Sequence, residues 1–234
     1  MLKDLGKYIF MVELGLKYLK VFKKTFFHPF ISFRPAYRQL SKDRQAYSNE
    51  VLDFLNIEVE MIGSIPSRDK ILYAINHRSL LDIIVMENIF SKHNKNGAWI
   101  AKQQLFDAFY GNFFKYSGSL AVDLEHGKGL LKFYKEMKKI LTKVDDMNIY
   151  IFPEGERYKG KGIKDFQNGA EKIAKANGLD IVPVYIDDTL ENVFRAAPYP
   201  KKRVVKVYVG DVIIENDLDF NYKVLINLAN KGKN

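Results

Sequence analysis

Short apolar runs alternate with helix-like runs over most of the chain, and this alternation constrains the fold more than any other feature. Runs typical of strands cover residues 58–62, 71–75, 98–101, 119–122, 148–152, 181–186 and 204–209. Runs with helical spacing cover residues 80–90, 129–142 and 167–176. Such alternation predicts an α/β fold, with a mostly parallel sheet flanked by helices.

The composition allows one domain of catalytic size. A chain of 234 residues that is 47% hydrophobic can bury a sizeable core. The sequence contains no cysteine, which excludes disulfides, zinc-thiolate sites and a thiol nucleophile. No window reaches the length of uncharged apolar sequence that a spanning helix needs, and the start lacks the features of a signal peptide. We therefore expect a cytoplasmic protein, either free or bound to a membrane surface.

The first 28 residues predict an amphipathic helix with a wide apolar face. Its apolar stripe recurs at steps of three and four residues and consists of Leu5, Ile9, Val12, Leu16 and Leu19. Phe10, Leu14 and Val21 widen the stripe and leave a narrow polar wedge that is rich in lysine. One interpretation is a core helix packed on its own domain. The other is an interfacial helix, with its apolar face in the lipid headgroup boundary.

The charge distribution favours the interfacial interpretation. The chain carries a net charge of +9, and residues 1–50 hold ten basic residues against four acidic ones. Each basic residue near an anionic leaflet contributes about 1 kcal/mol to binding. Two prolines in residues 28–37 end the first helix, and residues 39–55 predict a second amphipathic helix. We therefore expect a membrane-interfacial helical segment over residues 1–56 and an α/β domain over residues 57–234.

A basic chain could also bind nucleic acid or an acidic carrier protein. The sequence contains no recognisable nucleic-acid module, so nucleic acid ranks last and we expect no such partner. The remaining histidines, His28, His93 and His126, lie in breaks or polar loops without the spacing of metal ligands, so we expect no metal site.

The stretch "ILYAINHRSLLDIIV" places polar residues between a strand-like run and a helix-like run. Working residues of open α/β sheets collect where strands end and helices begin. His77 lies at such a junction and can act as base and then as acid near neutral pH. If Asp82 lies in the first helical turn, its carboxylate can fold back to the Nδ1 proton and orient the ring. The alternative is a surface histidine near a helix cap, with an aspartate that favours a helix start.

The stretch "IYIFPEGERYKGKGIKDFQNGA" contains a second candidate site after a strand-like run. A glycine at position 155 lets the backbone approach a ligand closely, and Arg157 could hold a phosphate in a fork of hydrogen bonds. The alternative is a hairpin turn that carries a surface ion pair. Each motif by itself is weak.

Together, several blocks resemble the glycerolipid acyltransferase family, whose bacterial members act on 1-acylglycerol-3-phosphate. "NHRSLLD" fits the family's Asn-His-four residues-Asp motif, and "FPEGER" resembles its Phe-Pro-Glu-Gly-Thr-Arg motif. "AK" at 101–102 and "IVPVYI" at 181–186 resemble further blocks, and "GSLAVDLEHG" at 118–127 stands where the second block would be. The matches keep the family's order over residues 71–186, about half of the chain.

The resemblance implies transfer of a fatty acyl group from a thioester to the free hydroxyl of a lysophospholipid, with lysophosphatidate as the expected acceptor. His77 would take the hydroxyl proton and Asp82 would orient His77. Lys102 and Arg157 would bind the substrate phosphate, and Glu154 with Gly155 would shape the acceptor pocket. No cofactor is implied, since acyl carrier protein or coenzyme A brings the acyl group as a co-substrate. The expected location is the cytoplasmic face of the cell membrane, at an anionic surface.

Two departures from the family pattern concern the headgroup. Leu124 stands where the second block carries its arginine, and Glu156 stands where threonine is usual. A carboxylate beside the phosphate site opposes anion binding by Coulomb repulsion. An acyltransferase for another lysolipid headgroup therefore remains open, as does a membrane-bound adaptor that keeps the fold without turnover.

Overall fold

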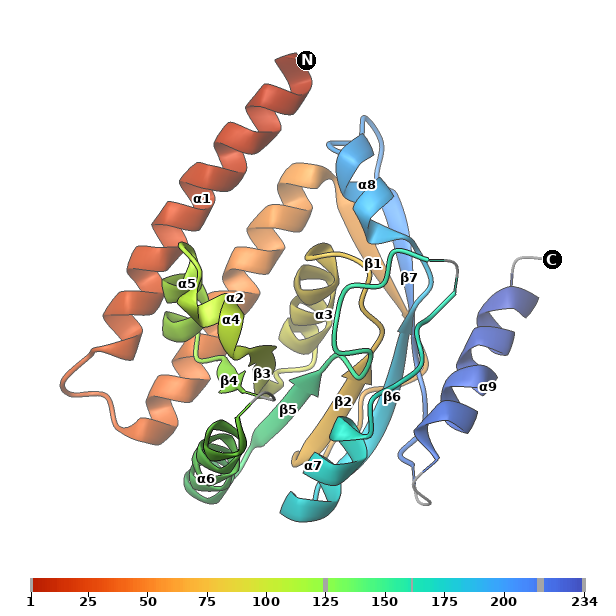
Figure 1. Cartoon of the computed structure of the whole chain (residues 1–234). Coiled ribbons are helices and arrows are strands. Elements are labelled where there is room, and N and C mark those ends of the chain that lie inside the picture. The colour runs from red at the N-terminus through yellow and green to blue at the C-terminus, as the bar shows by residue number, and fades with distance from the viewer. Residues whose placement is uncertain (1, 124–125, 161, 214–216, 233–234) are drawn as a thin grey trace.

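The sheet has the predicted character. The computed structural model describes residues 2–123, 126–160, 162–213 and 217–232, and within them seven strands form one sheet in the order β1-β7-β6-β2-β5-β3-β4 (Figure 1). The strands are β1 (Ile57–Ile62), β2 (Ile71–Ile75), β3 (Asn96–Lys102), β4 (Leu120–Val122), β5 (Met147–Ile151), β6 (Asp180–Ile186) and β7 (Arg203–Val209). All neighbouring pairs are parallel except β6 with β7. The prediction of a mostly parallel sheet is confirmed.

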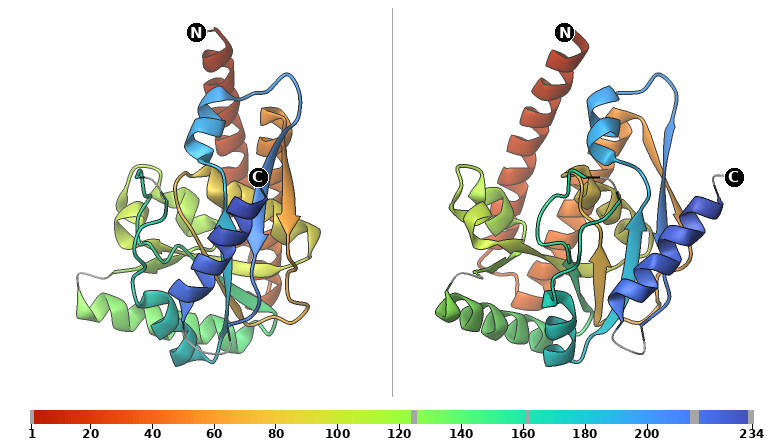
Figure 2. Two further views of the ribbon diagram at one scale, coloured as in Figure 1. Left: turned by 90° about the vertical axis from the view of Figure 1, so that its right-hand side faces the viewer. Right: turned by 45° about the vertical axis from the view of Figure 1, so that its right-hand side comes forward.

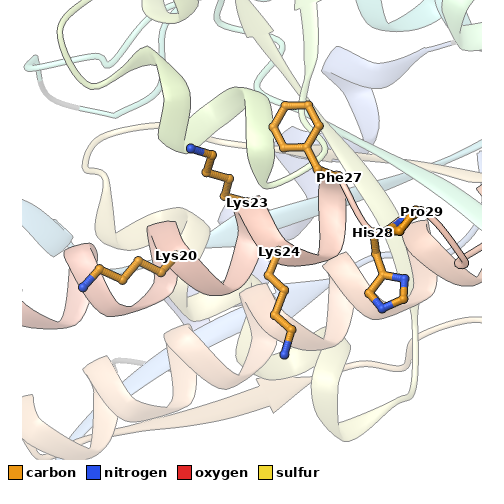
Figure 3. A pocket seen from close by; sticks show the side chains of 6 residues that line it. All are labelled: Lys20, Lys23, Lys24, Phe27, His28 and Pro29. Atoms are coloured by element: carbon orange, nitrogen blue, oxygen red, sulfur yellow. The ribbon is translucent and has the colours of Figure 1, made fainter.

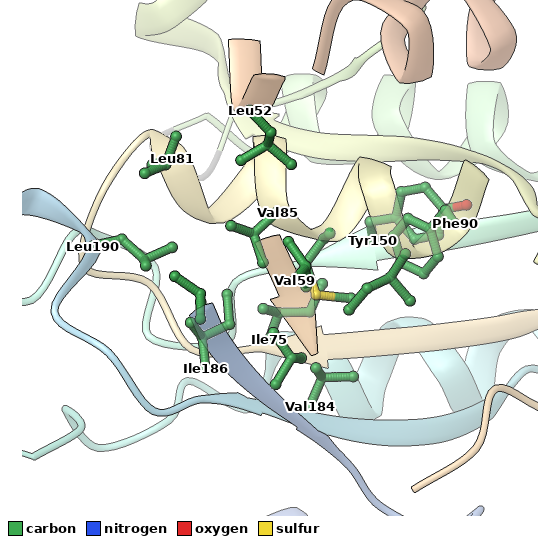
Figure 4. Packing of buried hydrophobic residues seen from close by; sticks show 14 of the residues in the cluster. Leu52, Val59, Ile75, Leu81, Val85, Phe90, Tyr150, Val184, Ile186 and Leu190 are labelled. Atoms are coloured by element: carbon green, nitrogen blue, oxygen red, sulfur yellow. The ribbon is translucent and has the colours of Figure 1, made fainter. Parts of the chain in front are cut away.

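Helices cover both faces of the sheet (Figures 1 and 2). One face carries α1 (Leu2–Phe26), α2 (Phe33–Leu55), α3 (Leu81–Lys92) and α8 (Leu190–Ala196). The other carries α6 (Gly127–Lys143), α7 (Gly169–Asn177) and α9 (Leu218–Lys231). Figure 4 shows the first of these two cores, where side chains of α2, α3 and α8 meet those of the strands. Because helices cover both faces, every residue of the central strands β2 and β5 is buried, instead of every second one.

Several helices differ from the sequence predictions. Helix α2 begins at Phe33, six residues before the predicted start. Helices α4 (Gln103–Asp107), α5 (Gly111–Tyr116) and α8 were not predicted, because five to seven residues are too few to display a helical period. Helix α9 was also missed, although its buried residues at 218, 222, 225 and 229 have helical spacing and the Asp217 side chain accepts a bond from the Phe220 N–H.

Helix α1 has two apolar sides with different surroundings. Leu14, Tyr18 and Phe22 are buried against the core. The predicted stripe is largely on the other side, where four of its members are about half exposed or more: Leu5, Ile9, Val12 and Leu16. The helix is therefore both a core helix and the carrier of an exposed apolar face. Among the described residues, no helix combines the length and the apolar character needed to cross a bilayer.

A buried lysine fixes the first half of α1 to the rest of the molecule. Lys7 is only 1% exposed, and its Nζ donates to the carbonyl oxygens of Phe194, Arg195 and Ala197 at 3.0–3.1 Å. These carbonyls lie at the end of α8, where a cation satisfies otherwise unpaired acceptors and the helix dipole. Helices α1 and α2 share one apolar cluster with the strands, and the domain division at residue 56 remains a prediction.

Candidate active site

The parallel pairing of β2 with β5 brings the two sequence motifs together. The carboxyl ends of both strands lie at the same end of the sheet, so His77 after β2 and residues 152–157 after β5 become neighbours. The His77 N–H donates to Glu154 Oε1 at 2.8 Å, and the Tyr158 N–H donates to the His77 carbonyl at 2.8 Å. Direct hydrogen bonds therefore join the two motifs, although His77 and Glu154 are 77 residues apart in the sequence.

We call residues 76–82 the catalytic turn. Its last residue, Asp82, contacts three other residues of the turn. Asp82 Oδ2 lies 2.8 Å from His77 Nδ1 and also accepts the N–H groups of Arg78 at 2.6 Å and Ser79 at 2.8 Å. The side chain is only 2% exposed and lies in the first turn of α3. The structure therefore brings His77 and Asp82 into the expected contact, with the carboxylate folded back from the helix start.

These contacts assign the tautomer of His77. A carboxylate only accepts hydrogen bonds, so Nδ1 carries a proton, and in the neutral ring the lone pair is then on Nε2. The ring lies flat against Phe152, with a centroid distance of 3.7 Å and an interplanar angle of 10°. Stacking and the Asp82 contact together hold the imidazole in one orientation. Phe152 was not singled out from sequence, although it immediately precedes the Pro-Glu-Gly run.

Asn76 was also missed, and it locks the catalytic turn to the neighbouring strand. Its side-chain amide donates to the Ile186 carbonyl at 3.0 Å and accepts from the Ile186 N–H at 2.7 Å. The residue is 1% exposed, so both bonds are shielded from water. This two-point contact fixes the end of β2 against β6, and its position directly before His77 was the available sequence signal.

Glu154 holds the catalytic turn through a hydrogen bond to its backbone. The carboxylate is 1% exposed and accepts the His77 N–H at one oxygen and the Lys164 N–H at the other, at 3.2 Å. Burial raises the pKa of Glu154 above its ordinary value, although the two backbone hydrogen bonds oppose the shift. Gly155 follows with a φ of 72°, a left-handed conformation that glycine adopts without strain. The contacts of Glu154 make it a positioning residue for His77, in addition to its expected place beside the acceptor pocket.

We call residues 156–160 and 162–164 the basic loop, which contains Arg157 and lies close enough to Lys102 for an electrostatic interaction between Lys102 and Glu156. Arg157 and Lys102 are exposed, and Lys102 follows β3 at the same end of the sheet. Glu156 forms an ion pair with Lys164 at 2.5 Å. That hydrogen bond lowers the pKa of Glu156 and raises the pKa of Lys164. Lys164, which sequence reasoning missed, thus offsets the negative charge of Glu156, while Leu124 lies outside the described residues.

Two further observations concern nucleophiles and metal ligands. Ser79 is 2% exposed and its Oγ accepts the Leu81 N–H at 3.2 Å, so the hydroxyl serves the helix start. Within the described ranges, no group of three or more His, Cys, Asp or Glu side chains is placed to hold a metal ion. The expected absence of a metal site stays a prediction.

Comparison with known proteins agrees with this geometry. A family model described as Acyltransferase matches residues 56–187, which is more than half of the chain and includes the catalytic turn and the basic loop. The chain belongs to the acyltransferase family. The resemblance seen in the sequence motifs is therefore confirmed.

Two curated relatives are named 1-acyl-sn-glycerol-3-phosphate acyltransferase. A 1-acyl-sn-glycerol-3-phosphate acyltransferase of Helicobacter pylori is 35% identical over 144 residues, which cover 61% of this chain and 58% of the relative. Its namesake in Escherichia coli is 26% identical over 137 residues, which cover 58% of this chain and 54% of the relative. The chain thus spans little more than half the length of these curated relatives.

A solved structure extends the likeness to the whole acyltransferase fold. The crystal structure of the 1-acyl-sn-glycerophosphate acyltransferase PlsC from Thermotoga maritima superimposes with a TM-score of 0.65 and covers 99% of this chain and 97% of that one. At 19% sequence identity this comparison establishes the fold. The N-terminal helices are therefore part of an architecture found in another solved protein.

Proposed function

We propose that this protein transfers a fatty acyl group from an acyl thioester to the free hydroxyl of lysophosphatidate at the surface of an anionic membrane. The observation that carries the proposal is the His77–Asp82 pair, with Nδ1 held at 2.8 Å and the lone pair of the neutral ring on Nε2. The names of the curated relatives support acyl transfer to 1-acylglycerol-3-phosphate.

In the proposed mechanism, His77 Nε2 takes the proton of the acceptor hydroxyl as its oxygen attacks the thioester carbonyl. Asp82 stabilises the imidazolium that forms and holds the ring in place. When the tetrahedral intermediate collapses, the C–S bond breaks, and the imidazolium returns its proton to the departing thiolate. Positioned proton transfer of this kind contributes about 10²- to 10⁴-fold to a rate. No covalent enzyme intermediate is needed, which suits a chain without cysteine.

In this proposal Arg157 and Lys102 bind the acceptor phosphate. Arginine can offer a phosphate two parallel hydrogen bonds, whereas lysine contributes a point charge. Glu154 and Gly155 shape the acceptor pocket from the start of the basic loop. The Glu156–Lys164 pair keeps the local charge from becoming negative, so the carboxylate at position 156 is compatible with a phosphate ligand.

The donor is an acyl group on acyl carrier protein or coenzyme A, both of which are acidic and suit a protein with a net charge of +9. The lipid surface meets the exposed apolar side of α1, at the cytoplasmic face of the membrane. A hollow near the end of α1 adds cationic groups to this side of the molecule. Its lining consists of Lys20, Lys23, Lys24, Phe27, His28 and Pro29 (Figure 3).

The decisive experiment measures acyl transfer to lysophosphatidate with either donor for the wild-type protein and for His77→Ala. We expect a loss of about 10²- to 10⁴-fold in kcat for the variant. His93→Ala is the matched control, because His93 is exposed at the opposite end of α3. Equal activity of His77→Ala and wild type would remove the proposed base.

The same assay separates the remaining alternatives. A panel of lysolipid acceptors with one donor tests the headgroup, and preference for another headgroup over lysophosphatidate would contradict the proposed acceptor. A protein that binds vesicles but shows no transfer to any acceptor, with or without His77, would be an adaptor instead of an enzyme.

A further inference from the structure

The corner between α4 and α5 presents aromatic side chains to solvent. Phe109 is fully exposed and Tyr110 is 56% exposed, although neither residue belongs to the helices on either side. Large aromatic side chains in full contact with water are costly, so two in succession at a turn require a reason. Nothing in the proposed catalytic mechanism uses them.

The corner is built firmly, so the exposure does not result from a loose loop. The Gly111 N–H donates to the Ala108 carbonyl at 2.8 Å, and a Cβ at position 111 would lie 1.9 Å from the Phe106 carbonyl oxygen. Only glycine fits there. Helix α5 is fastened to α1 within its first turn, where Phe113 packs on Phe22 with a centroid distance of 5.2 Å.

The corner also lies at the end of the sheet where the strands have their carboxyl termini, which is the end that carries the candidate active site. Helix α4 begins directly after Lys102, at the same end of the sheet as His77. Helix α5 lies alongside α1, and α4 packs on α5 (Figures 1 and 2). Tyr116 of α5 contacts Phe26 of α1 and the next residue, Phe27, with centroid distances of 5.6 and 5.3 Å. The corner therefore adjoins the helix whose exposed apolar side forms the proposed membrane contact.

We propose that Phe109 and Tyr110 insert into the interfacial layer of an anionic lipid leaflet, as a second attachment point beside α1. This inference rests on the proposed membrane-surface function. Aromatic side chains favour the headgroup boundary, and the exposed Lys115 of α5 supplies a cation for anionic headgroups. Two separated attachments fix the rotation of the molecule on the leaflet, which one helix cannot do. The end of the sheet that carries His77 is thereby held at the lipid surface.

The first test is sedimentation of the full-length protein with vesicles of phosphatidylglycerol and phosphatidylcholine. We expect Phe109→Ala to bind about tenfold more weakly than wild type, since a buried phenylalanine side chain is worth that factor or more. Phe220→Ala is the matched control, because Phe220 is an exposed aromatic on α9, which covers the opposite face of the sheet. Its binding should equal that of wild type.

A second measurement locates the side chain directly. In Phe109→Trp, lipids with brominated acyl chains should quench the added indole, after subtraction of the signal of the buried native Trp99. Phe220→Trp should not be quenched. Wild-type vesicle affinity in Phe109→Ala together with absence of quenching in Phe109→Trp would overturn the inference. Unchanged vesicle affinity with weaker binding of acyl carrier protein would also overturn it, in favour of a protein-docking corner.

Val12→Glu separates this inference from the proposed function. Val12 is exposed on the apolar side of α1, so a charge there should weaken vesicle binding. If Val12→Glu binds weakly and Phe109→Ala binds normally, only the corner has been misassigned. If Val12→Glu itself binds as wild type, the membrane contact proposed for α1 is wrong.

Discussion

The catalytic turn and the basic loop are adjacent in space but are held in different ways. In the catalytic turn, one Asp82 oxygen receives three hydrogen bonds and Asn76 is paired at both ends of its amide. In the basic loop, Arg157 is exposed and the Glu156–Lys164 ion pair is solvated. The groups proposed for proton transfer are thus fixed by buried contacts, whereas those proposed for the headgroup lie in solvent. Proton transfer requires one fixed arrangement of the reacting groups, whereas binding of a phosphate by charged side chains tolerates several arrangements.

The largest effect should come from Asp82→Asn. The amide has no negative charge to stabilise the imidazolium, and its N–H₂ group can donate to Nδ1 and select the wrong His77 tautomer, so we expect kcat to fall by about 10²- to 10⁴-fold with a smaller change in KM. Steady-state kinetics at several acceptor concentrations measures the split. A variant that changes only KM would show that the catalytic turn serves recognition, and the contrast between the two regions would fail.

Glu154→Gln tests whether the buried support of the turn is needed in its charged form. One of the two N–H groups that Glu154 accepts would face an amide N–H₂ group, which should cost about 1–3 kcal/mol of unfolding free energy. Chemical denaturation measures the difference. Asp219→Asn is a suitable control, because Asp219 is an exposed carboxylate in the first turn of α9. A loss of stability in the control as large as that in Glu154→Gln would contradict the assignment.

The difference in unfolding free energy between wild type and Glu154→Gln should depend on pH in one direction. Burial raises the pKa of Glu154 in the folded state above its ordinary value of 4.5, so the folded protein binds this proton more tightly than the unfolded chain does. The free energy of unfolding of wild type minus that of Glu154→Gln should therefore increase as pH falls from above the raised pKa towards 4.5. A difference that decreases over that interval would show that the backbone hydrogen bonds outweigh burial.

Arg157→Ala should affect binding more than chemistry. A charge-assisted contact to phosphate contributes about 1.5–3 kcal/mol, so the KM for lysophosphatidate should rise at least about tenfold while kcat changes little. Arg68→Ala is the matched control, because Arg68 forms an exposed ion pair with Asp180 at the opposite end of the sheet, where β2 and β6 begin. A large fall in kcat for Arg157→Ala would mean that the basic loop participates in the chemical step.

The smallest effect should come from Glu156→Thr. Removal of one exposed carboxylate leaves Lys164 unneutralised, so the KM for a phosphate-bearing acceptor should fall by a few-fold, in keeping with about 0.2–1 kcal/mol for exposed pairs. Lys164→Met should change the KM in the opposite direction. If Glu156→Thr instead raises the KM, the carboxylate holds Lys164 in a binding position, and the basic loop is more ordered than its exposure indicates.

The periodic patterns predicted most of the scaffold because they are local. Apolar runs located the seven strands found among the described residues, and helix-like runs located α3, α6 and α7, since burial on one or two faces imposes a period on the residues themselves. Helices α4, α5 and α8 could not be found in this way, because they are too short. Their positions depend on contacts with distant residues, such as Phe22 for α5 and Lys7 for α8.

The site divides along the same line. The sequence by itself determined that His77, Asp82, Glu154 and Arg157 belong to two motifs in family order, because residue types and spacing are written along the chain. Only the tertiary structure decided which atoms meet: Glu154 beneath His77, Phe152 against its ring, Asn76 across to β6 and Lys164 beside Glu156. These contacts join segments up to 110 residues apart, and pairing between strands, not local pattern, brings them together.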